Sequence, residues 1–492
     1  MNNIPFISIM ISMVASVVML LLGKKSEVAL KLAQGILLIV AILSLVMIPY
    51  FISNGGTITY MLGHYPSPWG NELRFGLLES ILAFVFSTVL LLAILGGKND
   101  IKEDIQSRKR SQYFALLMLL LLSLLALIYT NDIFTAYVFI EINTVASCGI
   151  VMVKESGETL RATIKYLFMS LMASGLFLIS IAILYSITGH LLIPALAESI
   201  KGLVASGNYK MPLYVSCALI TISMGVKSAM FPFHTWLPDA HGTATTASSS
   251  ILSGVVVKGY IILLIKIYYR VFGIELVKSM GLLNIVFLLG IAGMVFGSLF
   301  AIREKNLKRM IAYSSVAQIG YIYAGIGIGS FAGLAAALFH MIVHAYTKPL
   351  LFSSAGGLIA ASNHSKMIKD MTGAGKRNVM AGIGFLIGTL SMVGVPLFGG
   401  FASKLYLASS ASGTGYLFLI ALAISSFLNA LYYMPVLFRI YSRSSESAVV
   451  LDDEKSDAGY TMSIVCFAAV NIILGVAGIY VMHLLSQGVQ IL

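Results

Sequence analysis

The most restrictive feature of this chain is a succession of apolar segments, each long enough to cross a lipid bilayer. A membrane-spanning helix needs about 20 mostly apolar residues. Windows of that length fall near residues 4–22, 29–51, 75–96, 113–130, 132–153, 163–187, 212–236, 245–269, 281–302, 310–329, 331–360, 378–408, 415–440 and 460–486. A bilayer core offers the backbone no water, so such spans must be helical. The sequence predicts an all-α polytopic membrane protein with about fourteen transmembrane helices.

Charged residues are scarce and unevenly placed. They make up 11% of the chain, and the mean hydropathy is +0.93, whereas about 25% of the residues of a typical soluble domain are charged. The net charge of +12 is concentrated in short loops between the spans. This pattern excludes a soluble enzyme, a disordered chain and a nucleic-acid partner. The N-terminus lacks the basic start of a signal peptide, so we expect it to be a retained first span.

The loops alternate between basic and nearly uncharged. Of the 32 Lys and Arg residues, 22 fall in loops on one side of the predicted topology, and only Arg74, Lys201, Lys210, Arg270 and Lys278 fall in loops on the other. Short cytoplasmic loops carry the excess of Lys and Arg. We therefore expect a multi-pass protein of a prokaryotic plasma membrane with both termini outside. The remaining five lysines, Lys227, Lys258, Lys266, Lys348 and Lys404, lie within spans.

Charged residues inside spans need a functional reason, because inserting each one into the bilayer costs roughly 2.5–3.5 kcal/mol on insertion scales. Such residues therefore usually face the protein interior or a hydrated path. The fifth span carries one acid, Glu141, with Asn143, Thr144 and Ser147 close by. Its structural alternative is a hydrogen-bonded carboxyl with no role in transport. We interpret Glu141 as part of an ion path.

Two of the buried lysines stand beside prolines. Lys227 is followed five residues later by Pro232, and Lys404 follows Pro396 and glycines 394, 399 and 400. Proline removes a backbone hydrogen bond and clashes with the preceding turn, so both spans are expected to break. Broken helices at membrane depth mark ion and substrate sites in transporters. The alternative for Lys227, a side chain that snorkels to the interface, is disfavoured by its position near the middle of the span.

The eighth and eleventh spans add further ionisable groups. Lys258 is central in its span, whereas Lys266 lies nearer the end and is predicted to snorkel. His340, His344 and Lys348 share one helical stripe at four-residue spacing. Two histidines at this spacing could instead ligate haem or a metal, but no further ligand set is evident. Since histidine titrates near neutral pH, the stripe favours proton movement.

Cysteine placement argues against a bound cofactor. Cys148, Cys217 and Cys466 are far apart and form no metal-binding or disulfide pattern. We expect no cofactor and no metal in this chain, and any redox centre would belong to another subunit.

The chain also shows internal symmetry. Lys227 and Lys404 are 177 residues apart, and the same offset carries Glu141 onto Gln318. Five spans separate each pair, so two five-helix units would be inverted relative to each other. The predicted organisation is an N-terminal part (1–112), a first unit (113–270), a second unit (271–445) and a C-terminal helix (446–492), with irregular segments at 54–74, 188–211 and 442–459.

Three motifs carry a family resemblance: GVKSAMFPFHTWLPDAHGTATTASSSILSGVVVK, HMIVHAYTKPLLF and GVPLFGGFASK. They resemble the antiporter-like membrane subunits, which comprise the A-type and D-type components of Mrp sodium/proton antiporters, the large proton-pumping subunits of respiratory complex I, and subunits of membrane-bound hydrogenases. The resemblance covers essentially the whole chain. It implies fourteen helices with two inverted five-helix repeats and breaks in helices seven and twelve.

The resemblance also implies roles for individual residues. The family's glutamate of helix five matches Glu141, its lysine of broken helix seven matches Lys227, and its helix-eight base matches Lys258. Its helix-eleven histidines match His340 and His344, with Lys348 a further member, and its helix-twelve residue matches Lys404. The stretch GTATTASSS departs from many relatives, which have a proline-containing stretch there. The chain also lacks the C-terminal extensions of some relatives and is similar in length to the D-type component of Mrp antiporters.

The buried charges favour a proton-translocating membrane subunit, and the resemblance implies a subunit of a multi-subunit complex, the D-type component of an Mrp-type Na⁺/H⁺ antiporter. Its partners would be other membrane subunits, protons and the lipid bilayer. Sodium stays an open partner, because no carboxylate cluster in this chain suggests that it carries that ion. Three alternatives also stay open: a homologous subunit of a redox-driven complex, which leaves enzyme membership undecided, a lone secondary transporter, and a structural scaffold.

Overall fold

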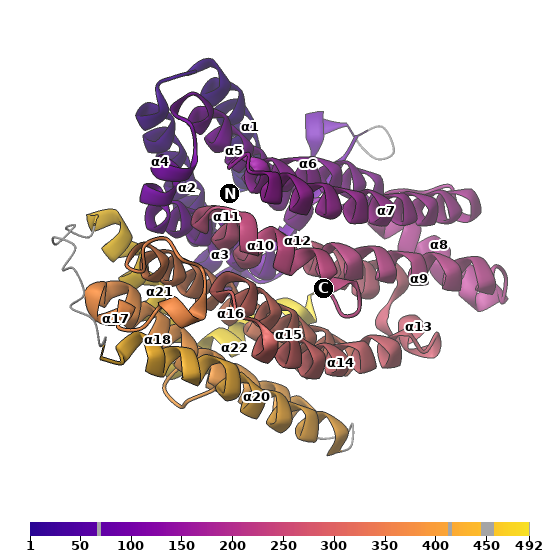
Figure 1. Ribbon diagram of the computed structural model, residues 1–492. Helices are drawn as coiled ribbons and strands as arrows, with labels where there is room; N and C mark the ends of the chain where they lie inside the picture. Colours follow the sequence, from indigo (N-terminus) through magenta and orange to yellow (C-terminus); the bar gives the residue numbers. More distant parts are fainter. Residues whose placement is uncertain (66–69, 412–415, 444–456, 492) are drawn as a thin grey trace.

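The computed structural model describes residues 1–65, 70–411, 416–443 and 457–491, and almost all of them are helical (Figure 1). Within these residues, eleven helices are long and apolar enough to cross a membrane. They are α1 (Ile4–Leu21), α2 (Ser26–Asn54), α3 (Leu77–Gly96), α5 (Ser107–Tyr129), α6 (Ile133–Met152), α7 (Gly157–Thr188), the continuous run Thr246–Phe272, α14 (Leu282–Arg303), α16 (Phe331–Ala360), α20 (Tyr416–Tyr441) and α21 (Ala458–Val476).

The other three predicted spans are also helical. They correspond to α9 (Lys210–Lys227), α15 (Leu307–Gly327), and the pair α18 (Val379–Val393) and α19 (Gly399–Ser410). The last helix, α22 (Gly478–Gln490), follows α21 directly. Every window selected from apolar length therefore contains helix, and the chain is a multi-pass, all-α membrane protein. Part of the predicted irregular segment 442–459 lies outside the described residues.

Two spans are interrupted beside their buried lysines. α9 ends at Lys227, and the chain passes through a cis Phe231–Pro232 bond before a 3₁₀ turn, η2 (Phe233–Trp236), and α10 (Leu237–Thr243). α18 ends at Val393, and Gly394 follows with a φ of 94°, a conformation that favours glycine. Helical structure resumes five residues later in α19.

The run Thr246–Phe272 is irregular in a different way. It begins as α11 (Thr246–Ile251), widens into a π-helical turn, η3 (Leu252–Val256), continues as α12 (Val257–Lys266) and ends in a second π turn, η4 (Ile267–Phe272). π turns inside helices are frequent at functional sites. Here one of them lies directly before Lys258.

Short elements gather at opposite ends of the helices. α4 (Lys98–Asp104), η5 (Ile368–Asp370) and α17 (Ala374–Arg377) belong to the lysine- and arginine-rich loops, whose end we call the basic face. β1 (Thr57–Met61), η1 (Leu62–His64), β2 (Glu72–Gly76), α8 (Ile193–Ser206) and α13 (Ile274–Ser279) belong to the other set of loops, the hairpin face. Figure 1 shows α4 and α17 far from α8 and α13, so the alternate loops sort to two ends as the topology predicts.

Two segments predicted to be irregular are structured. β1 and β2 pair as an antiparallel hairpin, with Thr57 opposite Gly76. α8 is a helix that buries Ile193, Leu196 and Ile200, a spacing of three and four residues, against the protein. A search for long continuous apolar segments misses this helix, because only one of its faces is apolar.

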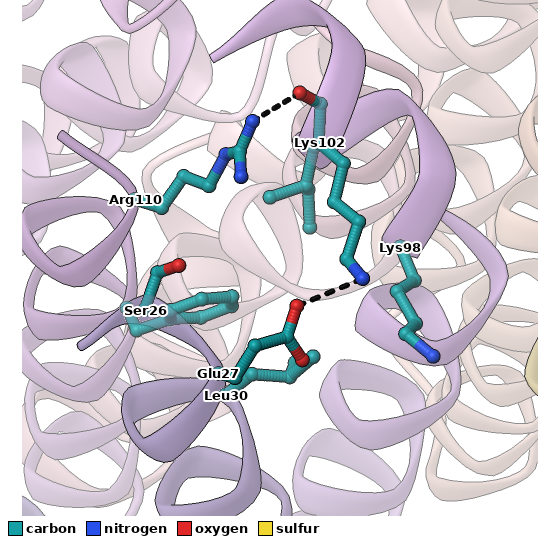
Figure 2. Close-up of a pocket in the computed structure, with 8 residues that line it drawn as sticks. Ser26, Glu27, Leu30, Lys98, Lys102 and Arg110 are labelled. Carbon is teal, nitrogen blue, oxygen red and sulfur yellow. Dashed lines mark hydrogen bonds and ion pairs between the residues drawn. The ribbon is translucent and has the colours of Figure 1, made fainter. Parts of the chain in front are cut away.

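Ion pairs tie the loops of the basic face together. Lys154 bonds to Asp104 at 2.5 Å, and Asp239 accepts from both Lys165 at 2.7 Å and Arg309 at 2.6 Å. Figure 2 shows a surface pocket at this face, in which Lys102 pairs with Glu27 at 2.8 Å. No residue of the predicted ion path lines that pocket.

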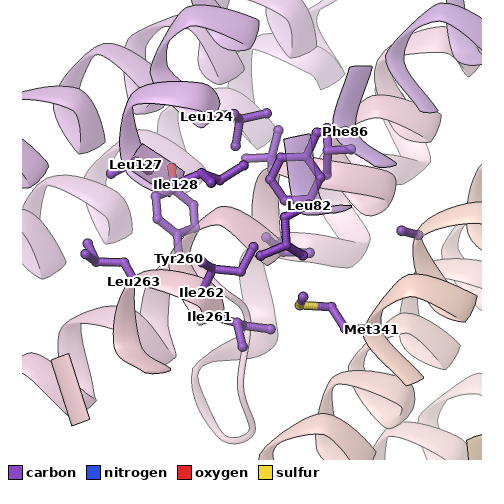
Figure 3. Packing of buried hydrophobic residues seen from close by; sticks show 14 of the residues in the cluster. Leu82, Phe86, Leu124, Leu127, Ile128, Tyr260, Ile261, Ile262, Leu263 and Met341 are labelled. Carbon is purple, nitrogen blue, oxygen red and sulfur yellow. The ribbon is translucent and has the colours of Figure 1, made fainter. Parts of the chain in front are cut away.

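Dense apolar packing fixes the centre of the molecule. Side chains of α3, α5, α12 and α16 interlock there, as Figure 3 shows for Leu82, Ile128, Ile262 and Met341. Protein interiors packed this closely transmit small displacements and exclude water. Buried charges in such surroundings need partners from the protein itself.

Candidate functional site

The acid of the fifth span and the lysine of the broken seventh span belong to one polar cluster. Lys227 is fully buried at the last residue of α9, and its Nζ donates to Thr144 Oγ1 at 2.9 Å. Thr144 follows Glu141 by three residues, so both lie on the same side of α6. Glu141 is half-buried, and its Oε1 is enclosed with no hydrogen-bond partner in the described chain.

Tyr260 links this cluster to the eighth span. Lys227 Nζ lies 5.5 Å from the centre of the Tyr260 ring, and the Tyr260 hydroxyl donates to Asn143 Oδ1 at 2.8 Å. A cation over an aromatic face is attracted by the ring's charge distribution. Lys258, two residues before Tyr260, is fully buried and donates to the backbone oxygen of Ser253 in the π turn.

The two histidines of α16 differ in their bonding. His340 Nδ1 is 2.9 Å from Ser403 Oγ of α19, and its ring stacks on Tyr321 at 5.2 Å. His344 is equally buried, but neither of its ring nitrogens has a partner in the part of the chain that is described. Lys258, Lys348, His340 and His241 all act electrostatically on His344. His344 therefore stands between the eighth span and the rest of its own stripe.

Lys348 is held by groups from two other helices. Its Nζ donates to Ile311 O at 3.0 Å, to Tyr433 OH at 3.3 Å and to Ser314 Oγ. Ser314 in turn bonds with Tyr433 at 2.7 Å. Three hydrogen bonds to one ammonium compensate for the loss of its hydration.

Lys404 occupies the second helix break. Its Nζ donates to Met392 O at 2.8 Å and to Val393 O at 2.9 Å, the last carbonyls of α18. A cation at a helix C-terminus is favourable, because it satisfies orphan carbonyls and meets the negative end of the helix dipole. The ammonium also lies 5.5 Å from the centre of the Tyr321 ring, which stacks on His340.

The position of Lys266 near the end of a span predicts that its side chain snorkels to an interface, and this prediction is wrong. Only 2% of this residue is exposed, and Nζ donates to the carbonyls of Leu127 at 3.2 Å, Ile128 at 2.8 Å and Thr130 at 2.6 Å. These carbonyls close the C-terminal end of α5. The sequence cannot show this arrangement, because the partners come from a helix 136 to 139 residues away.

The structure thus places the predicted residues in a series. It begins at Glu141 and Lys227 and continues to Tyr260 and Lys258, whose charge acts on His344. From there His340 and Lys404 both contact the ring of Tyr321. Lys348 lies beside this series. Gln318, the symmetry-related partner of Glu141, is fully buried, and neither side-chain polar atom has a partner within the described residues.

A further buried histidine was not predicted from the sequence. His241, in α10, is completely buried and stacks on Phe352 at 4.7 Å, and neither ring nitrogen has a partner in the described residues. The charges that act on it are those of Lys348, Lys308 and Lys258. A histidine fourteen residues after Lys227, just past a helix break, is the signal that could have found it.

Charges at the basic face are strongly coupled. Burial acts to raise the pKa of Asp239, but hydrogen bonds from Lys165 and Arg309 outweigh it and hold that pKa below its usual value. Burial lowers the pKa of Lys366, whose Nζ donates to Gly242 O at 3.0 Å. Lys308, 4% exposed, donates to Ala244 O at 3.2 Å nearby. The connection between α10 and α11 is therefore held by two lysines.

No group of three or more His, Cys, Asp or Glu side chains among the described residues could hold a metal ion. Cys148, Cys217 and Cys466 are free thiols. The polar groups around Glu141, Lys227 and the histidines of α16 are instead lysines, histidines, hydroxyls and one carboxylate, which are groups that bind and release protons or orient water.

A multi-pass helical fold with buried lysines at two helix breaks and buried histidines on a neighbouring helix is typical of ion-translocating membrane subunits. The family model for "NADH:quinone oxidoreductase/Mrp antiporter, TM" matches residues 130–429. The chain belongs to this family.

Curated relatives come from two branches. The chain is 32% identical over 385 residues to NADH-quinone oxidoreductase subunit N of Desulforudis audaxviator, covering 78% of this chain and 75% of the relative. It is 25% identical over 480 residues to the D-type component of the Na⁺/H⁺ antiporter of Alkalihalophilus pseudofirmus, covering 97% and 94%. The second likeness extends over nearly the whole of both chains.

Two solved structures share the fold. A chain of the Mrp complex from Dietzia sp. superposes with a TM-score of 0.87 at 20% identity, covering 99% of this chain and 96% of that one. A chain of the membrane-bound sulfane sulfur reductase, an archaeal respiratory membrane complex, superposes with a TM-score of 0.86 at 26% identity, with the same coverage. Both structures are of membrane complexes.

Proposed function

We propose that this chain is the proton-translocating subunit of a multi-subunit membrane complex, the D-type component of an Mrp-type Na⁺/H⁺ antiporter. The observation that carries the proposal is the buried series from Glu141 and Lys227 through Lys258 and the histidines of α16 to Lys404. Buried ionisable groups are retained in membranes where they serve ion pathways. The near full-length likeness to a D-type antiporter component supports this assignment.

In the proposed mechanism, protons move along this series at mid-membrane depth and Glu141 acts as the switch. Opposite unit charges about 4 Å apart attract by roughly 4 kcal/mol at an effective dielectric constant near 20. When Glu141 approaches Lys227, the ammonium is stabilised. When the two separate, the lysine gives its proton to the next group. Thr144 is positioned to hold the ammonium in the separated arrangement.

The organisation proposed for the chain follows from the two breaks. Residues 113–270 and 271–445 form two inverted five-helix repeats, flanked by 1–112 and 446–492, with Pro232 and Pro396 marking the breaks. The basic face lies in the cytoplasm of a prokaryotic cell, and both termini lie outside. Other membrane subunits complete the assembly, and sodium passes through one of them.

The second candidate is the homologous subunit of a redox-driven complex. The 32% identity to an NADH-quinone oxidoreductase subunit and the structural likeness to a respiratory complex favour it. The proton path would be the same, but electron transfer in other subunits would drive it. In both cases no cofactor is bound by this chain.

Two experiments test these assignments. Gentle solubilisation and mass spectrometry of every co-purifying subunit separates them. Small membrane subunits with another large antiporter-like chain indicate the antiporter, and stoichiometric iron–sulfur or flavin subunits indicate the redox complex. In membrane vesicles, Glu141→Ala and Lys227→Ala should each abolish proton-coupled transport while the complex still assembles. Normal transport by either assembled variant would contradict the proton path and would leave a scaffold role open.

A further inference from the structure

A cavity near the hairpin face contains two buried charges outside the series described above. A space with room for about one water molecule is lined by Glu79 of α3 and Lys266 of α12. The rest of its lining is aliphatic, including Leu82, Ile128 and Ile262, which Figure 3 shows close together. Glu79 is 6% exposed and Lys266 is 2% exposed. Two charges facing one apolar cavity carry a large desolvation cost and need a reason.

Lys266 is a fixed charge rather than a carrier. Its three hydrogen bonds to the end of α5 use all three ammonium protons. The charge of Glu79 acts on Lys266 and on Arg270, and one guanidinium nitrogen of Arg270 is buried without a partner in the described chain. Glu79 therefore lies near two cations that come from one helical segment, Lys266–Arg270.

Glu79 has one oxygen engaged and faces two spaces. Its Oε2 accepts from Gly76 N at 2.9 Å and so caps α3. It also lines a second, outer crevice, formed with Thr57, Gly76 and Ile491 at the hairpin face, which is too narrow in this structure to hold a water molecule. Nearby, Arg74 closes this end by donating to Ile491 O at 2.7 Å. Within these two spaces, Glu79 is the ionisable residue common to both linings.

We propose that Glu79 is a proton-carrying residue that connects the buried lysine series with the hairpin face, and that Lys266 is its positioning charge. The inference rests on the proposed function. Lys258 and Lys266 lie eight residues apart on one helix, about 12 Å at 1.5 Å per residue, and Lys266 shares the cavity with Glu79, so the cavity lies two helical turns from the series. A protonated water in the cavity gives its proton to the carboxylate, and the carboxyl then gives it to water in the outer crevice. The crevice is closed to water in this structure, so the second transfer requires a side-chain movement that opens it.

Glu79→Gln separates this role from helix capping. A capping box accepts Gln as well as Glu, so the variant keeps the acceptor for Gly76 N but cannot carry a proton at this position. Glu79→Asp keeps a carboxyl on a shorter side chain. Glu72→Gln is the matched control, because Glu72 is also buried near the hairpin, accepts from Asn131 Nδ2 at 2.9 Å and lines neither space.

The complex with each variant is assayed in membrane vesicles with a fluorescent pH probe, alongside Lys227→Ala. We expect Glu79→Gln to lower the proton transport rate at least tenfold, Glu79→Asp to restore at least a third of the rate, and Glu72→Gln to stay within twofold of the wild type. Transport within twofold by Glu79→Gln, with Lys227→Ala inactive, would overturn only the role of Glu79. Retained transport in Lys227→Ala would overturn the proposed function itself.

A labelling experiment on the wild-type complex tests the inference without a substitution, so it also applies if a Glu79 variant does not assemble. Hydrophobic carbodiimides modify carboxyls in their protonated form within apolar surroundings. After treatment and proteolysis, mass spectrometry should find the adduct on Glu79 and on Glu141 but not on Glu72. A wild-type complex labelled on Glu141 and unlabelled on Glu79 would overturn the inference.

Discussion

Lys227 is bonded to Thr144 rather than to the acid one helical turn before it. The Nζ to Oγ1 distance is 2.9 Å, and no ion pair within 4.0 Å joins Lys227 to Glu141 in the described part of the chain. The threonine hydroxyl thus satisfies the ammonium while the carboxylate stands apart. This arrangement is one of the two that a switch between Glu141 and Lys227 requires.

Thr144→Val should impair transport while preserving the fold. Valine has nearly the shape of threonine but cannot accept from Lys227, and a hydrogen bond to a charged group contributes about 1.5–3 kcal/mol. The ammonium then loses its partner in the separated state. We expect the transport rate in vesicles to fall about tenfold, since 1.4 kcal/mol corresponds to a factor of ten. Thr144→Ser, which keeps the hydroxyl, should retain most of the rate, and equal rates for the two variants would contradict the role of this bond.

Gly394→Ala should disturb Lys404 without removing it. A Cβ at Gly394 would lie 3.2 Å from both Cδ and Nζ of Lys404, and the φ of 94° is strained for alanine. The ammonium would be pushed from the carbonyls that end α18. We expect at least a fivefold loss of transport, measured on vesicles with matched amounts of complex. The control is Gly35→Ala, where an added Cβ meets nothing within 4 Å, and a loss of equal size there would show that the effect is not local.

Apolar length was enough to predict the helices, because a bilayer admits few alternatives for a segment of about 20 apolar residues. The interruptions beside Pro232 and Pro396 occur where proline chemistry places them. The hairpin and α8 were not predicted, because paired strands across a turn and a one-sided apolar pattern leave little signal in a window average. Helix formation in the spans follows from local sequence, whereas the pairing of β1 with β2 and the packing of α8 depend on contacts between distant parts of the chain.

The site was predictable to the same extent. The cost of a buried charge identified Lys258 and Lys404 as residues with partners. It could not name those partners, because Lys258 bonds to a π turn and Lys404 to the end of another helix segment. Lys266 shows the limit most clearly. Its position near a span end predicts snorkelling, and only the packing of α5 against α12 shows that the charge is enclosed.

The ion pairs of Asp239 with Lys165 and Arg309 should make the stability of the folded protein depend on pH. Its pKa is lowered in the folded state by Lys165 and Arg309, against the opposing effect of burial, so its contribution is present above the unfolded pKa and is lost as pH falls through the folded value. Each pair is partly exposed and contributes on the order of 0.2–1 kcal/mol. Asp239→Asn should lower the melting temperature of the purified complex at neutral pH. The difference in melting temperature between Asp239→Asn and the wild type should shrink when the pH falls below the usual pKa of aspartate. A difference in melting temperature that grows in acid would contradict this assignment.

His241 should be required for exchange between the basic face and the buried series. It is the enclosed histidine on which Lys308, near that face, and Lys348, beside the series, both act, and its ring nitrogens are free to take part in proton transfer. His241→Phe keeps an aromatic ring against Phe352 but cannot accept a proton. We expect transport in vesicles to fall about tenfold with normal assembly, which co-purification of the other subunits checks. His190→Phe, at the exposed hairpin face, is the matched control and should be unaffected. Undiminished transport by His241→Phe would show that protons reach Lys348 and Lys258 by another route.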